Sequence, residues 1–195
     1  NHEGFNHRKQ IGSLTYLYKK GECDSVSSFE TFYLQNGKET LGHRLKDGIY
    51  DGRTLEELSR LAIRFQAKLG DDYSLEECIL YVWIRLFYET HLGMQRETKA
   101  IQNFALEHPD FTIIPTSIEV DVRFAVDAEV FFEGTLLYGL QVKSPAYLKN
   151  QHRILKETKQ FNRQKNQTYQ AQFDVPVHYL IADSNGTILD LIENY

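Results

Sequence analysis

The sequence lacks several features that would place it in a familiar class at once. Its two cysteines, Cys23 and Cys78, are far apart and in no CxxC pair, which argues against a disulfide framework and favours a reducing cytoplasm. No apolar run reaches the ~20 residues of a membrane span, and no signal peptide is visible. A glycine-rich phosphate loop is missing too. These absences predict a cytoplasmic protein that uses neither a membrane nor a nucleotide cofactor.

Histidine patterns offer little. His91, His108, His152 and His178 form no HExxH, HNH or catalytic-triad spacing. We expect each to be structural or at the surface, although His152 could touch phosphate.

An excess of positive charge is also lacking, but the charge is unevenly distributed. The formal net charge is −5, yet residues 143–165 carry seven basic residues against the single acidic Glu157. A basic footprint on an acidic protein can attract phosphate, although a solvated helix face would look the same. Amides such as Asn166 could add contacts to bases or phosphates. The predicted DNA-binding residues are Lys149, His152, Arg153, Lys156, Lys159, Arg163 and Lys165.

Just before this basic segment, two stretches have the composition of paired β-strands. Residues 123–132 and 136–143 are rich in Val, Phe, Leu and Tyr, and Gly134 lies between them. A three-residue loop, residues 133–135, with Gly134 at positive φ would join the strands as a hairpin. This register places Asp127 directly opposite Gln141.

The two-residue period of a strand then brings four polar groups to one face. Asp127 and Glu129 share this face with Gln141 and Lys143 of the neighbouring strand. A solvated hairpin face is the ordinary explanation of such a set. The apolar residues in the opposite register and the strand-ending Pro145 favour a site at the rim of a core.

These residue types suit metal-dependent hydrolysis of a phosphodiester. Mg²⁺ prefers oxygen ligands and keeps several waters, so Asp127 could bind it directly, and Gln141 could offer an amide oxygen or orient a metal-bound water. Lys143 would be a cation beside the attacking water and the scissile phosphate. The sequence therefore predicts Mg²⁺ as the cofactor.

This arrangement resembles the core of the PD-(D/E)xK nuclease superfamily. In that core a helix precedes a three-stranded meander that carries an Asp and then (E/Q)xK, followed by a helix and another strand. Asp127, Gln141 and Lys143 match the three motif positions, while Val126 stands in place of the motif's Pro and Gln141 in place of the commoner Glu. The resemblance implies a restriction-endonuclease-like fold and Mg²⁺-dependent nuclease activity.

More narrowly, residues from about 85 to 190 are similar to MjaI-like type II restriction endonucleases. The similarity lies in His91-Leu92-Gly93-Met94 through Glu97, in Val126-Asp127, and in the run from Gly139 to Tyr147. The superfamily places an acidic residue on the helix before the meander, and Glu97 matches it. The resemblance thus implies that Glu97 joins Asp127 and Gln141 as catalytic and metal-binding residues. Glu89, about two turns earlier, is the reserve candidate.

The rest of the chain predicts a mainly helical N-terminal region. Capping boxes at Thr54 and Ser74 each open a helix, the first ending near Leu69 and the second very apolar and buried. Gly93 is expected to interrupt the second helix. The aromatic residues of the first 50 positions are expected to pack on a core, and the basic ones could help to clamp DNA.

Residues 113–114 and 118–126 are predicted as further strands. Residues 147–172 are predicted as the basic helix, and 177–182 as a buried strand that turns at 183–186 into 187–192. The predicted fold class is α/β, mixed α+β. Residues 1–84 would form the N-terminal region, for DNA clamping, dimerisation or recognition, and 85–195 the nuclease core.

The sequence and the resemblance together predict a type II restriction endonuclease. It would act as a homodimer on a short palindromic site in double-stranded DNA, because two-fold symmetry matches two cuts in antiparallel strands. Three alternatives stay open. They are a nuclease of the same core for repair, junction or RNA processing, a non-catalytic DNA-binding module, and a metabolic enzyme with a fortuitous pattern.

Overall fold

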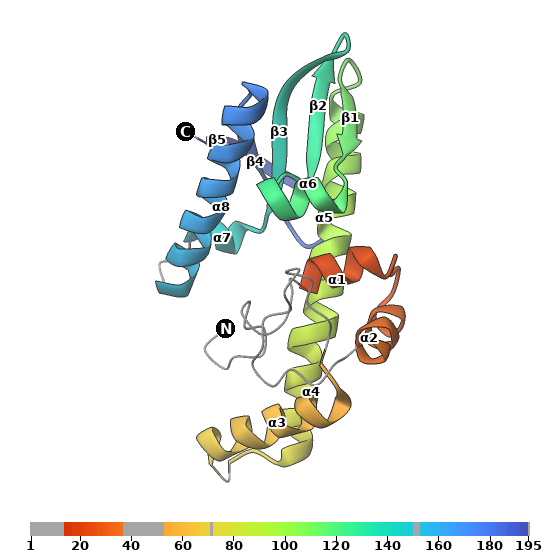
Figure 1. The fold of residues 1–195 in the computed structure, drawn as a ribbon, viewed down its shortest axis with the longest axis vertical. Coiled ribbons are helices and arrows are strands. Elements are labelled where there is room, and N and C mark those ends of the chain that lie inside the picture. Colours follow the sequence, from red (N-terminus) through yellow and green to blue (C-terminus); the bar gives the residue numbers. More distant parts are fainter. Residues whose placement is uncertain (1–13, 37–52, 71, 150–152, 195) are drawn as a thin grey trace. The chain divides into compact units, whose positions relative to one another are not determined.

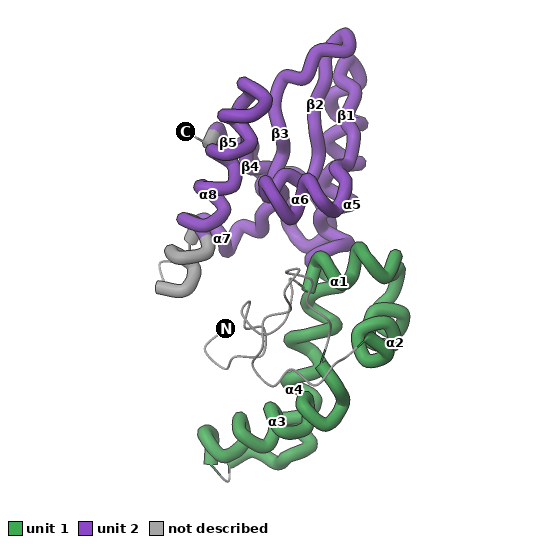
Figure 2. Tube along the Cα trace, viewed as in Figure 1, with its two compact units in different colours: residues 1–92 green, residues 93–195 purple. Residues whose placement is uncertain are grey.

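The computed structural model describes residues 14–36, 53–70, 72–149 and 153–194, with side chains except at 149, 153–158 and 194. The chain forms two compact units, residues 1–92 and 93–195 (Figure 2). Sequence analysis placed the division between residues 84 and 85. The roles suggested there for the N-terminal region stay predictions.

The described part of the first unit is helical and has an aromatic core. The ring centre of Phe29 lies 5.1 Å from that of Tyr18, 6.0 Å from that of Tyr33 and 5.7 Å from that of Phe87. Phe29 and Tyr33 are fully buried, so the expectation that such aromatics pack in a core is confirmed for them. None of the helices in the described ranges is long and apolar enough to cross a bilayer. The helices are α1 (Leu14–Lys20), α2 (Val26–Gln35), α3 (Leu55–Leu69) and α4 (Leu75–Trp83).

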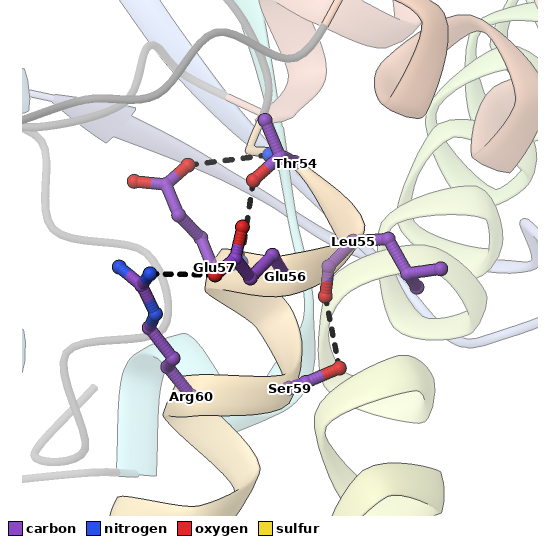
Figure 3. A network of polar contacts seen from close by, with 6 residues as sticks. All are labelled: Thr54, Leu55, Glu56, Glu57, Ser59 and Arg60. Carbon is purple, nitrogen blue, oxygen red and sulfur yellow. Dashed lines mark hydrogen bonds and ion pairs between the residues drawn. The ribbon is translucent and has the colours of Figure 1, made fainter.

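Helices α3 and α4 begin at the capping boxes that the sequence predicts. The amide of Glu57 donates to the hydroxyl of Thr54, and the amide of Thr54 donates back to the Glu57 carboxylate, both at 3.2 Å (Figure 3). Ser74 and Glu77 repeat this exchange at 3.2 and 2.7 Å. Each box satisfies two amides that the first turn of a helix leaves unpaired.

The expected burial of the second helix is only partly correct. Val82 and Leu86 are buried, but Ile79 and Leu80 are 46% and 56% exposed. Because a helix that packs along one stripe leaves its other side in solvent, an apolar sequence alone does not bury all of α4.

The expected break at Gly93 is wrong. A π-helical turn, η1 (Ile84–Tyr88), joins α4 to α5 (Glu89–Glu107), and α5 runs through Gly93 without interruption. Met94 and Ala100, which follow on the same helix, are buried. Such packing outweighs the cost of ~1 kcal/mol that glycine adds to a helix interior.

Replacing Gly93 by alanine should therefore stabilise the protein. A Cβ atom at this position would meet nothing within 4 Å outside the helix's own backbone. The free energy of unfolding is expected to rise by roughly 0.5–1 kcal/mol, because alanine has the higher helix propensity. Urea denaturation followed by circular dichroism measures it, with the exposed Gln95→Ala on the same helix as control. A Gly93→Ala variant less stable than the wild type would contradict an unstrained helix here.

The second unit is built on a five-stranded mixed sheet in the order β1-β2-β3-β4-β5 (Figure 1). Neighbouring strands are antiparallel except β3 and β4, which are parallel. The unit thus confirms the mixed α/β class, and the turn at 183–186 joins β4 to β5 as predicted. The strands are β1 (Thr112–Pro115), β2 (Ala128–Phe132), β3 (Thr135–Lys143), β4 (Val177–Ala182) and β5 (Ile188–Asn194).

Helices cover both faces of the sheet. On one face Ala100, Ile101 and Phe104 of α5 pack on a core that includes Ala128, Val130, Leu140 and Leu180. On the other face Phe124 of α6 (Ile118–Phe124) and Tyr169 of α8 (Arg153–Phe173) pack with Val126 and Val177. The short α7 (Pro145–Lys149) links β3 to α8. Side chains of β3 therefore alternate between an α5 side and an α8 side.

Residues 118–124 form helix α6 rather than the predicted strand. The hydroxyl of Ser117 accepts from the amide of Val120 at 3.4 Å, and Ala125 ends the helix in the left-handed conformation (φ 56°). Alternating Ile118, Val120 and Val122 suggested a strand, but the cap and the packing of Phe124 decide for a helix. The strand predicted from residue 123 accordingly begins only at Ala128.

Candidate active site

The predicted site begins where β2 and β3 part. Ala128 pairs with Leu140, and Asp127 and Gln141 are the next residues beyond this last pair. The amide of Asp127 donates to the Leu140 carbonyl at 2.7 Å, while the amide of Val142 donates to the Asp127 carboxylate at 2.7 Å. The carboxylate thus continues the ladder in place of a backbone carbonyl and is held at the end of the strand pair.

The register arises differently from the way the sequence predicts. The loop has two residues, Glu133 and Gly134, both at positive φ (49° and 79°), as a tight hairpin turn requires. Phe131 pairs with Leu136 but Val130 pairs with Tyr138, so a β-bulge leaves Leu137 as an extra residue on β3. The shorter loop and the bulge compensate, so the register continued one step past Ala128 and Leu140 is the one that the sequence predicts for Asp127 and Gln141.

Gln141 is the most unusual group of the site. It is 3% exposed, and its amide oxygen, itself buried, accepts no hydrogen bond from any residue that the structure describes. Leaving a buried acceptor unpaired costs about 1–3 kcal/mol. Such a group calls for an explanation, and a cation that binds through oxygen would supply the missing partner.

Lys143, at the end of β3, lies beside an aromatic ring that also contacts a second lysine. Its ammonium nitrogen is 5.3 Å from the ring centre of Tyr147 in α7, and that of Lys159 in α8 is 5.0 Å from the same centre. Tyr147 is 9% exposed and packs edge-on against Tyr179 of β4, with ring centres 5.6 Å apart. Two cations from different elements therefore meet at one ring.

Glu129 faces the α8 side, as Gln141 and Lys143 do, but has a different partner. The hydroxyl of Tyr169 donates to its carboxylate at 2.7 Å. Burial, together with the acceptor Glu129, raises the pKa of the Tyr169 hydroxyl. Glu129 thus joins β2 to α8.

The two candidate helix carboxylates, Glu89 and Glu97, lie in different surroundings. Glu89 is exposed and pairs with Arg85 one turn earlier. Glu97 is half-buried and lies one turn before the core residues Ala100 and Ile101. Its neighbour Arg96 donates to the carbonyl of Asp183, just after β4, so Glu97 lies near the sheet end at which β3 and β4 finish. Its role as a ligand stays a prediction.

The predicted DNA-binding residues separate into several environments. Lys159 contacts Tyr147, Arg163 is exposed on α8, and the ammonium of Lys165 donates to the carbonyl of Val122. His152 lies outside the described residues, as do the side chains of Lys149, Arg153 and Lys156.

The prediction that Asn166 contacts bases or phosphates is wrong. It is 3% exposed, and its amide donates to the carbonyls of Phe124 and Ala125 at 3.0 and 3.3 Å. It therefore satisfies the end of α6 from α8, a role that depends on how two distant helices pack.

The residues present fit a hard divalent ion bound mainly by water and substrate. Within the described ranges no group of three or more His, Cys, Asp and Glu side chains could hold a metal. Asp127 offers one anionic ligand and Gln141 an orphaned neutral oxygen. Mg²⁺ is commonly held by one or two carboxylates, with waters and phosphate completing its shell. The donor set suits Mg²⁺ better than the nitrogen- and sulfur-rich sites of zinc.

Comparison with known proteins adds nothing to this picture. No family model, curated protein or solved structure matches the chain.

Sequence reasoning missed Tyr147 as part of the site. The sequence feature that could have indicated it is the position of Tyr147 four residues after Lys143, just beyond the end of the strand. The partnership with Lys159 has no signal at the sequence level, because it depends on where α8 lies against the sheet.

Proposed function

We propose that the protein is a Mg²⁺-dependent endonuclease that hydrolyses phosphodiester bonds in both strands of duplex DNA. The observation that carries the proposal is the buried, unpaired amide oxygen of Gln141, next in sequence to Val142, whose amide holds the carboxylate of Asp127. Lys143 follows two residues later on the same face of β3. A carboxylate, a neutral oxygen and an ammonium are what hydrolysis of an anionic diester needs at one place.

Each residue has a distinct part in the proposed reaction. Asp127, fixed by the amide of Val142, and the oxygen of Gln141 would hold Mg²⁺, which supplies a water of lowered pKa. The ammonium of Lys143 would lie beside the attacking water and the scissile phosphate, where it stabilises the charge that builds up on the phosphate oxygens. Glu97 is the proposed further carboxylate; because α5 packs on the sheet face opposite Gln141, it would reach the ion around the end of the strands.

The order of elements in the second unit supports the proposal. Helix α5 precedes an antiparallel meander of β1, β2 and β3, and α8 then leads to β4, which is parallel to β3. This is the order that the resemblance to PD-(D/E)xK nucleases implies. Helix α6, between β1 and β2, is an addition to it.

The basic segment after β3 supports a nucleic-acid substrate. Residues 143–165 carry seven basic residues in an otherwise acidic chain. We propose a homodimer acting in the cytoplasm on a short palindromic site, since one two-fold axis then relates both cuts. The other outcomes are a nuclease for branched, single-stranded or RNA substrates, and a DNA-binding module without activity.

The first test is incubation with long, unmethylated duplex DNA at low salt, with Mg²⁺ or with EDTA. We expect discrete fragments with Mg²⁺ and none with EDTA, and the fragment ends would reveal the recognition site. Parallel reactions with branched DNA, single-stranded DNA and RNA identify a different substrate. If all substrates stay intact while the folded protein binds duplex DNA without Mg²⁺, it is a binding module and the catalytic proposal fails.

Replacing Gln141 by glutamate should couple stability to Mg²⁺. A second carboxylate beside Asp127 in a buried place would lower the free energy of unfolding in EDTA by roughly 2 kcal/mol or more, because a buried charge needs a partner. Mg²⁺ should restore most of this loss, since the ion binds the folded state. Thermal unfolding in EDTA and in a series of Mg²⁺ concentrations measures both effects.

Two matched variants test the specificity of this coupling. Gln164→Glu makes the same change on the exposed face of α8 and should not respond to Mg²⁺. Gln141→Met removes the orphaned oxygen and should be about as stable as the wild type. If Mg²⁺ leaves the melting temperature of Gln141→Glu unchanged, Gln141 is not beside the ion.

A further inference from the structure

The ring of Tyr147 gathers two lysines that are sixteen residues apart in the sequence. Lys143 ends strand β3 and Lys159 lies in α8, yet their ammonium nitrogens are 5.3 and 5.0 Å from the same ring centre. Both distances are within the ~6 Å range of a cation–π contact. Both ammonium groups contact one ring, so positive charge is concentrated at the end of β3, and such a concentration attracts phosphate.

The ring that orders these lysines is itself firmly held. Tyr147 is 9% exposed, and the edge-on contact with Tyr179 fixes it against β4. Its buried hydroxyl has no hydrogen-bond partner among the residues that the structure describes. The ring thus contributes a face for the ammonium groups, while the hydroxyl makes no hydrogen bond within the described residues.

The neighbouring basic residues of α8 have other surroundings. The ammonium of Lys165 is engaged with the carbonyl of Val122 and lies over Phe161. Arg163, one turn after Lys159, is exposed. Lys159 differs from both because it shares a ring with the lysine of the candidate active site.

We infer that Lys159 is a second phosphate-binding lysine of the active site, and that Tyr147 is a positioning residue that holds it together with Lys143. The ligand is a phosphodiester of a nucleic-acid backbone, which both ammonium groups contact. The inference deepens the proposed nuclease function and rests on it. Lys143 serves the scissile phosphate, and Lys159 adds a second cation to the same phosphate or to its neighbour.

Cleavage kinetics with matched charge changes test the role of Lys159. Lys159→Gln should lower kcat/KM on duplex DNA by about 10- to 100-fold, in line with the loss of one charged contact to the reacting group. Lys99→Gln removes the same charge from an exposed position of α5 and should lower kcat/KM less than about threefold. Arg163→Gln, at a predicted DNA-binding residue one turn from Lys159, should have a clearly smaller effect than Lys159→Gln. Equal effects of the Lys159 and Arg163 variants would overturn the inference, because α8 would then act only as a general basic surface.

Two changes at Tyr147 test the positioning role. Tyr147→Phe keeps the ring and removes only the orphaned hydroxyl, so its kcat/KM should stay within about threefold of the wild type. Tyr147→Leu keeps an apolar residue but removes the π face, and should resemble Lys159→Gln. If leucine serves as well as phenylalanine in a folded protein, the ring does not position the lysines.

An NMR titration separates failure of this inference from failure of the nuclease proposal. Lysine side chains labelled with ¹³C at Cε are followed while inorganic phosphate is added to the wild type. We expect the Lys143 and Lys159 signals to be shifted by the ring, to move together with phosphate, and to lose both properties in Tyr147→Leu. The Lys165 signal should stay in place.

Each result decides one of the two claims. If phosphate moves both signals but no substrate is cleaved, the anion site stands and the nuclease proposal fails. If the wild type cleaves DNA while phosphate moves neither signal, the nuclease proposal stands and the two-lysine site is wrong.

Discussion

Replacement of Asp127 by asparagine is expected to lower the single-turnover rate of Mg²⁺-dependent DNA cleavage by at least about 10³-fold. Asparagine has nearly the same shape, and its amide oxygen can still accept the hydrogen bond from the amide of Val142. The backbone geometry at the end of β2 should therefore survive, while the anionic ligand is lost. Quenched-flow cleavage at saturating DNA and Mg²⁺ measures the rate.

Two control measurements test whether the loss of cleavage is specific to Asp127 and whether DNA binding is retained. Asp190→Asn makes the same change at an exposed position of β5 and should cleave at the wild-type rate. In EDTA, Asp127→Asn should bind duplex DNA at least as tightly as the wild type, because a negative charge facing the phosphates has been removed. An Asp127→Asn protein that cleaves normally would exclude this carboxylate from the reaction.

Replacing Gly186 by alanine should lower the free energy of unfolding more than alanine at Gly93 or Gly134. Gly186 lies in the β4–β5 turn at φ 81°, and a Cβ atom there would be 2.4 Å from the Cβ of Lys99 and 2.9 Å from the amide nitrogen of Ala100. Since the nearest atoms are backbone and Cβ atoms of α5, no flexible side chain can move away. We expect the free energy of unfolding to fall by roughly 3 kcal/mol or more.

A second glycine separates the two causes of this loss. Gly134 has nearly the same φ, 79°, but an added Cβ would meet nothing within 4 Å. Gly134→Ala therefore measures the backbone cost alone, about 1 kcal/mol. Urea denaturation of both variants gives the difference, which is the cost of pushing the turn away from α5. Equal losses would show that the close approach is unimportant.

The contact at Gly186 positions more than a turn. The side chain of Asn103 donates to the Gly186 carbonyl at 2.9 Å, and Arg96 donates to the carbonyl of Asp183 at 3.1 Å. These bonds fix α5 against the sheet end at which β3 and β4 finish. Glu97 lies between them on the helix, so the same contact determines where its carboxylate can reach.

What the sequence could predict depended on local chemistry. The capping boxes at Thr54 and Ser74, and the turn before Gly186, need only a few neighbouring residues, and all three are found as expected. Residues 118–124 were predicted as a strand because their alternation fits a strand, while the helix is selected by a cap and by packing. Gly93 was expected to break the helix. Instead α5 continues through it, because the residues that follow, such as Met94 and Ala100, are buried.

In the candidate site, too, local patterns could be predicted and long-range packing could not. Alternation along β3 was enough to place Gln141 and Lys143 on one face. The partners of Glu129 and Asn166, and the meeting of Lys143 with Lys159, depend on how α6 and α8 pack on the sheet. No periodicity in the sequence carries that information. The loop length was predicted wrongly, and an unpredicted bulge compensates for it; the paired register ends at Ala128 and Leu140, so the predicted facing of Asp127 and Gln141 one step further stays a prediction.

That bulge means that the number of residues between the two polar residues depends on whether the hairpin contains a bulge, and is not fixed. Thirteen residues separate Asp127 from Gln141, an odd number, whereas a regular hairpin with a two-residue loop leaves an even number between facing positions. The extra residue, Leu137, makes up the difference. A chain without Leu137 would form the regular hairpin and still bring Asp and Gln face to face across twelve residues. A search pattern with one fixed spacing would therefore miss proteins that build the same site.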